Sequence, residues 1–139
     1  MPRRYLSGVY FSAPTIQPIT PTGIIQMKTL LITGGTGFLG GAVIEKILQR
    51  NEKVNLLLLV RAGDAEAGLA RVLNNMRKFN LTEAQLSMLT SSQIVCGDLG
   101  EPESFLHDVR LDSVTHVINC AAVASFGNNP LIWKVNVLG

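Results

Sequence analysis

Short apolar runs alternate along this chain with segments whose apolar residues recur at every third or fourth position. The apolar runs predict strands at Lys28–Thr33, Val54–Val60, Gln93–Cys96 and Thr115–Ala121. The run over Val54–Val60 is almost continuously apolar, which is typical of a strand that is buried on both faces of a parallel sheet.

Helical spacing fills the intervals between these strands. It predicts helices over Gly37–Arg50, from Asp64 as the cap to Phe79, from the capping box Thr82–Gln85 through Leu89, and over Pro102–Val109. The dipeptide Asn129-Pro130 predicts a last helix that runs toward Gly139. This alternation indicates an α/β fold with a Rossmann-like, doubly wound parallel sheet of strand order 3-2-1-4, cut short after about four strands.

Residues 1–26 show no periodicity, are rich in Pro, Thr and Ser, and contain Arg3 and Arg4 but no acidic residue. We interpret them as a flexible N-terminal arm in loop conformation. An upstream start codon with Met27 as the true start, or a targeting role, are the alternatives. Residues 27–139 are then the N-terminal part of a dinucleotide-binding Rossmann domain.

Composition narrows the possible partners and surroundings. Of the 139 residues, 47% are hydrophobic and 16% charged, which predicts one folded domain. The net charge of +2 comes from the arm. The sequence has no basic stripe, which argues against nucleic acid as a partner. The sequence contains no run of about 18 apolar residues, so no membrane span is predicted. Neither His107 nor His116 has partners at metal-ligand spacing, so no metal is expected.

The two cysteines are expected to be free thiols. Cys96 and Cys120 lie near the ends of strands that the predicted order sets three spacings apart, on the order of 14 Å. A disulfide requires Cα atoms within about 7 Å of each other. Unbridged thiols are typical of a reducing, cytoplasmic location.

A glycine-rich turn follows the first predicted sheet strand and opens the first helix. Glycines 34, 37 and 40 fit G-x-x-G-x-x-G, and glycines 35, 37 and 40 fit G-x-G-x-x-G, so the pattern alone does not choose a subfamily. Such a turn lets the backbone approach a pyrophosphate at the positive end of a helix. The predicted cofactor-binding residues here are Thr33, Gly34, Gly35, Thr36, Gly37, Phe38, Leu39 and Gly40.

An arginine ends the second sheet strand, where NAD-selective sites carry an acidic residue for the ribose 2′-hydroxyl. Arg61 can instead hold a 2′-phosphate and stack on adenine, which predicts NADP(H) as the cofactor. Arg71 on the following helix is a second candidate. A solvated side chain is the alternative interpretation of either arginine.

Two further strand ends supply candidate cofactor contacts. Asp98 can accept a hydrogen bond from the adenine amino group, and Leu99 can pack on the ring. Asn119, Ala121 and Ala122 end the fourth strand, where small residues let the backbone pass close to a cofactor. A Gly-Asp turn and ordinary close packing are the respective alternatives.

Together these residues resemble the extended short-chain dehydrogenase/reductase superfamily. Its motifs are matched in order by Thr33–Gly40, Gly97–Leu99, Ala121-Ala122 and Asn136–Gly139. The chain is most similar to the thioester and fatty-acyl reductase branch. That similarity rests on the turn Thr-Gly-Gly-Thr-Gly-Phe-Leu-Gly, on Leu-Val-Arg-Ala at 59–62, and on the long connection from Arg61 to Ile94.

The resemblance implies NADPH-dependent hydride transfer to an acyl thioester, with an aldehyde or alcohol as product. It also implies a Ser/Thr and a Tyr-x-x-x-Lys pair at the reacting carbonyl, with Asn136 as a supporting residue. The only tyrosines are Tyr5 and Tyr10, and neither is followed by Lys four residues later. We therefore expect a fragment that holds the cofactor half, with the acyl thioester bound by a missing C-terminal part.

Two other functions are compatible with the same motifs. One is a fragment of an NAD(P)-dependent sugar-nucleotide epimerase or dehydratase, which Arg61 and the long connection disfavour. The other is a non-enzymatic dinucleotide-binding sensor, which needs the glycine turn but not Tyr-x-x-x-Lys.

Overall fold

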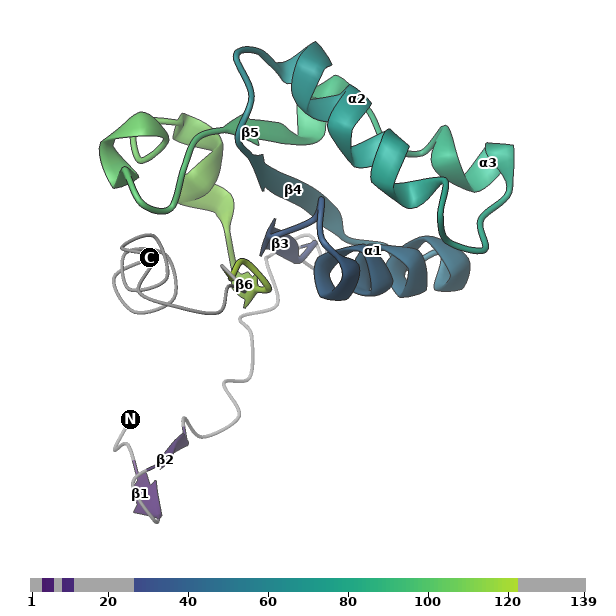
Figure 1. The fold of residues 1–139 in the computed structure, drawn as a ribbon. Helices are drawn as coiled ribbons and strands as arrows, with labels where there is room; N and C mark the ends of the chain where they lie inside the picture. Colours follow the sequence, from purple (N-terminus) through teal and green to yellow (C-terminus); the bar gives the residue numbers. More distant parts are fainter. Residues whose placement is uncertain (1–3, 7–8, 12–26, 123–139) are drawn as a thin grey trace, which may run out of the picture.

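The computed structural model describes residues 4–6, 9–11 and 27–122. Four parallel strands form the central sheet, namely β3 (Thr29–Thr33), β4 (Asn55–Val60), β5 (Ile94–Cys96) and β6 (His116–Asn119). Their order is β5-β4-β3-β6 (Figure 1), which is the predicted order 3-2-1-4. All four predicted strands and the α/β fold class are confirmed. The helix expected from Asn129-Pro130 lies outside the described residues.

Side chains of β4 alternate between two hydrophobic clusters, which explains its continuous apolar run. Leu56, Leu58 and Val60 pack on one face of the sheet, and Leu57 and Leu59 pack on the other. All five are buried. Each face therefore has its own core, and a central strand of this kind cannot show a polar alternation.

The first cluster is covered by three helices on one face of the sheet (Figure 1), namely α1 (Phe38–Arg50), α2 (Ala65–Met76) and α3 (Glu83–Leu86). The predicted caps are confirmed: the Asp64 carboxylate accepts from the Ala67 N–H at 2.8 Å, and Thr82 and Gln85 form the capping box of α3. Both α2 and α3 end three residues before the predicted bounds. The caps thus fix where the helices begin, while loop packing decides where they end.

The other face carries short 3₁₀ turns, η2 (Pro102–Ser104) and η3 (Val109–Ser113). The helix expected over Pro102–Val109 is wrong. Phe105 packs on the second cluster, but Leu106 is 56% and Val109 79% exposed. A helix this short depends on a packed apolar face for its stability, and one half-buried side chain does not provide it.

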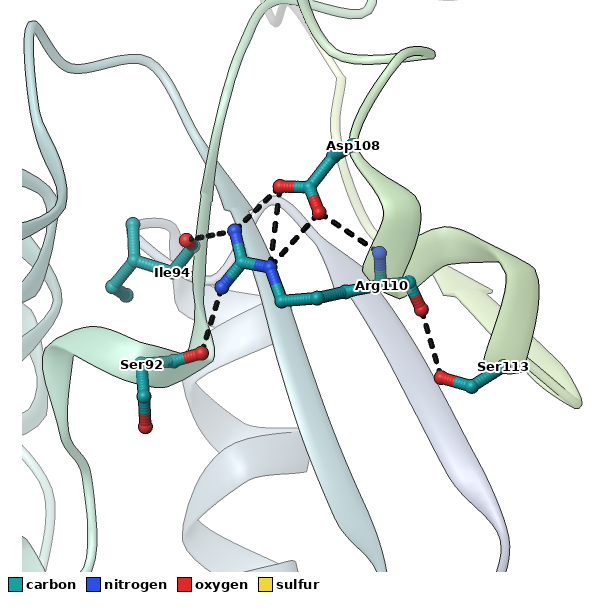
Figure 2. A network of polar contacts seen from close by, with 5 residues as sticks. All are labelled: Ser92, Ile94, Asp108, Arg110 and Ser113. Carbon is teal, nitrogen blue, oxygen red and sulfur yellow. Dashed lines mark hydrogen bonds and ion pairs between the residues drawn. The ribbon is translucent and has the colours of Figure 1, made fainter.

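Arg110 fastens this face to the sheet (Figure 2). Its guanidinium donates to the backbone carbonyls of Ser92, in the 3₁₀ turn η1 (Ser91–Gln93), and of Ile94, at 2.7 and 2.9 Å. It also forms an ion pair with the Asp108 carboxylate at 2.5 Å. This charge-assisted hydrogen bond holds the pKa of Asp108 below its ordinary value. One arginine thus links the start of β5 to the connection that leads to β6.

A small hairpin corrects the prediction of loop over residues 1–26. Strands β1 (Arg4–Leu6) and β2 (Val9–Phe11) pair antiparallel, with Tyr5 opposite Tyr10. Aromatic and β-branched residues on either side of Ser7-Gly8 are a hairpin signature, and the prolines further along obscured it. The loop assignment is wrong for these six strand residues.

Candidate functional site

A cavity of about 200 Å³ opens at the carboxyl ends of the four parallel strands. In open α/β sheets, ligands bind at this edge, beside the point where the strand order reverses. Here that point lies between β3 and β6. The lining residues come from the ends of β3 and β4, from the segments that follow all four strands and from α2, and they are Thr33, Gly34, Thr36, Gly37, Leu59, Val60, Arg61, Arg71, Gly97, Asp98, Leu99, Cys120, Ala121 and Ala122.

The glycine turn forms one wall of this cavity, and its shape requires glycine at two positions. Gly34 has φ of +74°, and a Cβ there would lie 2.5 Å from the carbonyl carbon of Cys120. A Cβ on Gly40 would collide with the carbonyl of Gly34. The Gly37 N–H closes the turn by donating to that carbonyl at 3.0 Å. The turn is thus wedged between the end of β6 and the first turn of α1.

The amino terminus of α1 is open toward an anion. Within the described part of the chain, no side chain caps this terminus, and the first turn contains no acidic residue. The first N–H groups of a helix lack partners within the helix, and the helix dipole favours negative charge there. A backbone cradle that only glycine fits, at an uncapped helix terminus, suits a pyrophosphate.

Two arginines meet where β4 ends. Arg61 and Arg71 both line the cavity, and the Arg71 guanidinium donates to the backbone carbonyl of Arg61. Among the lining residues that the structure describes, none at this end is acidic. The only carboxylate in the described lining, that of Asp98, follows β5, where it accepts from the Gly100 N–H at 2.8 Å. The β4 end is therefore cationic.

Hydrogen bonds between strand ends fix the opposite wall. The Thr33 hydroxyl donates to Asn119 Oδ1 at 2.5 Å. The Ala121 N–H points at Thr33 Oγ1 and Asn119 Oδ1, at 3.3 and 3.2 Å. Asn119 thus ties β6 to β3, and it leaves Ala121 and Ala122 to line the cavity.

Ten of the predicted cofactor residues line this one cavity, and they are Thr33, Gly34, Thr36, Gly37, Arg61, Arg71, Asp98, Leu99, Ala121 and Ala122. Gly35, Phe38, Leu39, Gly40 and Asn119 do not line it: the two predicted glycines pack inside the turn, and the Phe38 and Leu39 side chains are exposed. Asn136 lies outside the described residues.

Four lining residues were missing from the predicted set, and they are Leu59, Val60, Gly97 and Cys120. Each lies at or next to a predicted strand end. Since the carboxyl ends of parallel strands share one edge, their position was a usable signal. Asn75, which contacts the turn from α2, carried no such signal.

Comparison with known proteins identifies the chain by its sequence. The model of an NAD-binding family described as Male sterility protein matches residues 32–139. The chain belongs to this family. Fatty acyl-CoA reductase 8 of Arabidopsis thaliana is 36% identical over 118 residues, which cover 73% of this chain and 24% of that protein. The L-2-aminoadipate reductase large subunit of Penicillium chrysogenum is 34% identical over 102 residues, 72% of this chain and 7% of that one.

Solved structures of reductase domains are also similar to this chain. The terminal R domain of the myxalamid PKS-NRPS pathway matches with a TM-score of 0.66 and 26% identity, over 81% of this chain and 29% of that chain. A thiolation-reductase di-domain from an archaeal non-ribosomal peptide synthetase matches with a TM-score of 0.64 and 25% identity, over 82% and 24%. The chain spans about a quarter of the length of the Arabidopsis reductase and of the two solved chains, and 7% of the Penicillium protein.

These findings confirm the resemblance to the thioester reductase branch. They identify the chain as an NAD(P)-binding region of a reductase family, with a nicotinamide dinucleotide as the cofactor class. Within residues 27–122, each helix is too short or too polar to cross a bilayer.

Proposed function

We propose that this chain provides the NADP(H)-binding site of a reductase that transfers a hydride to an acyl thioester. The observation that carries the proposal is the cavity itself, which brings the glycine turn, two arginines and the ends of β5 and β6 around one volume. A pyrophosphate on the turn would leave the adenosine end near β4, since Arg61 and Arg71 lie on that side.

The preference for NADP(H) over NAD(H) rests on the cationic end of β4. A 2′-phosphate adds charge that a guanidinium can bind through two parallel hydrogen bonds. A ribose 2′-hydroxyl would instead be matched by an acidic residue, and the described lining at this strand end has none.

The proposal that the substrate is an acyl thioester rests on the names of the relatives. Their names include a fatty acyl-CoA reductase and a reductase domain joined to a thiolation domain. A common substrate chemistry for both is an acyl group on a phosphopantetheine thiol, carried by coenzyme A or by a protein. One hydride from the cofactor and one proton would give the aldehyde and the free thiol, and a second hydride and proton would give the alcohol.

Titration of the purified protein with NADPH and NADH tests the cofactor preference. Losing a hydrogen bond to a charged group costs about 1.5–3 kcal/mol, or about 10- to 100-fold in affinity. We expect Arg61→Ala and Arg71→Ala to weaken NADPH binding by such factors and to leave NADH binding nearly unchanged. Lys53→Ala is the matched control, because Lys53 is an exposed cation just before the opposite end of β4. Equal or tighter binding of NADH by the wild type would refute the NADP(H) assignment.

A further inference from the structure

Asn75 contacts the glycine turn through its side-chain amide. It lies on α2 and is only 8% exposed. Its side-chain amide nitrogen donates to the backbone carbonyls of Gly35 and Gly37, at 3.1 and 3.0 Å. Asn75 does not line the cavity. One buried amide thus contacts two peptide groups of the turn, and the Gly37 carbonyl accepts in addition from the Gly41 N–H of α1 at 3.0 Å.

Holding these carbonyls also fixes the N–H groups on the other side of the same peptides. In a planar trans peptide, the C=O of one residue and the N–H of the next point in opposite directions. The carbonyls of Gly35 and Gly37 share their peptides with the N–H groups of Thr36 and Phe38. When Asn75 draws the carbonyls toward α2, these two N–H groups face away from it. Donation to a carbonyl also polarises its peptide and strengthens the N–H as a donor.

Close packing keeps Asn75 at this position. A Cβ on Gly41 would lie 2.9 Å from the Asn75 amide nitrogen and 2.6 Å from the ring of Phe79. The Phe79 ring stacks on that of Phe38, with centroids 6.2 Å apart. The end of α2 is therefore seated directly on the first turns of α1.

The same helix also reaches the other end of the cavity. Arg71 precedes Asn75 by four residues, so the two side chains lie on one face of α2. Arg71 lines the cavity beside Arg61. The helix thus links the cationic end of β4 to the glycine turn.

We propose that Asn75 is a positioning residue for the cofactor pyrophosphate. It orients the Thr36 N–H toward the phosphates, shares the orientation of the Phe38 N–H with the bond from Gly41 to the Gly37 carbonyl, and does not touch the cofactor itself. This inference rests on the proposed function, because it presumes a dinucleotide in the cavity. It adds a specific residue on α2 to the pyrophosphate site.

The test compares a ligand that contains the pyrophosphate with one that lacks it. Calorimetry on the purified protein gives Kd values for NADP⁺ and for adenosine 2′-phosphate. Asn75→Leu keeps a side chain of similar size but removes both donors. We expect it to weaken NADP⁺ by about tenfold, the equivalent of one to two hydrogen bonds, and to change adenosine 2′-phosphate less than about twofold. Asn74→Ala is the matched control, because Asn74 is the exposed neighbour on the same helix.

Each outcome decides a separate point. Equal weakening of both ligands, or of neither, would overturn the role of Asn75, since a merely structural residue would not separate them. If Asn75→Leu does not fold, Asn75→Ser, which leaves a smaller side chain beside the turn, takes its place with the same criterion. Failure of the wild type to bind either ligand would overturn the proposed function and this inference together, whereas normal wild-type binding confines any failure to Asn75.

Discussion

Replacing Gly34 by alanine should damage both the fold and the cavity, and its cost can be worked from two separate causes. The first is the backbone, because φ of +74° lies in the left-handed region. An L-residue there costs about 1–2 kcal/mol. The second is space, because the new Cβ would lie 2.5 Å from the Cys120 carbonyl carbon and 2.6 Å from the Ala121 nitrogen.

Relief of that overlap requires backbone to move. The atoms in the way belong to the chain leaving β6, which the Thr33 and Asn119 hydrogen bonds hold in place. Overpacking of this kind costs about 1–3 kcal/mol. We therefore expect Gly34→Ala to lower the free energy of unfolding by about 2–5 kcal/mol, and to weaken dinucleotide binding as the turn shifts.

Gly63→Ala is the matched control. A Cβ on Gly63 meets nothing within 4 Å, and its φ lies outside the left-handed region. This substitution should be neutral or stabilise the fold by about 0.4–1 kcal/mol through the unfolded state. Urea denaturation followed by circular dichroism measures both variants. The reasoning is refuted if Gly34→Ala unfolds within about 0.5 kcal/mol of the wild type, or if the two variants lose equal stability.

Two further predictions concern the opposite face and the cavity wall. Because its pKa is lowered in the fold, Asp108 contributes stability above its unfolded pKa near 3.8 and loses it as the pH falls further. Urea titrations between pH 5 and 2 should therefore show a steeper loss for the wild type than for Asp108→Asn, by at most about 1 kcal/mol for a pair that is partly open to solvent, and parallel curves would contradict this. Cys120 lines the cavity and Cys96 does not, so saturating NADPH should slow alkylation of Cys120, read by mass spectrometry, and spare the rate at Cys96. Equal protection of both thiols would argue against a cofactor in this cavity.

Local sequence was a good guide where burial follows from a short segment. The continuous apolar run of β4 is typical of a strand covered on both faces. Asp64 and Thr82 marked helix starts through hydrogen bonds that span three residues. The helix prediction for Pro102–Val109 was wrong because the conformation of this segment depends on which side chains reach the sheet. The hairpin was not predicted because six residues give a weak pattern beside many prolines.

The same distinction applies to the site. Residues after strand ends could be predicted, because a parallel sheet brings those ends to one edge. Asn75 could not, because its partners lie 40 and 38 residues earlier in the chain. A polar residue in a helix normally indicates a solvated position, and only the three-dimensional contact shows that its amide is buried against the turn.

The contact between the glycine turn and the chain that follows β6 bears on the order in which the domain folds. Gly34 rests against Cys120 and Ala121, and the bond from Ala121 to Thr33 joins residues 88 positions apart. During synthesis the turn leaves the ribosome long before the strand that supports it. Such non-local contacts form late, because the intervening chain must first be ordered. The cavity is thus complete only when β6 has joined the sheet, and ligand binding reports on the docking of β6 as much as on the glycine turn.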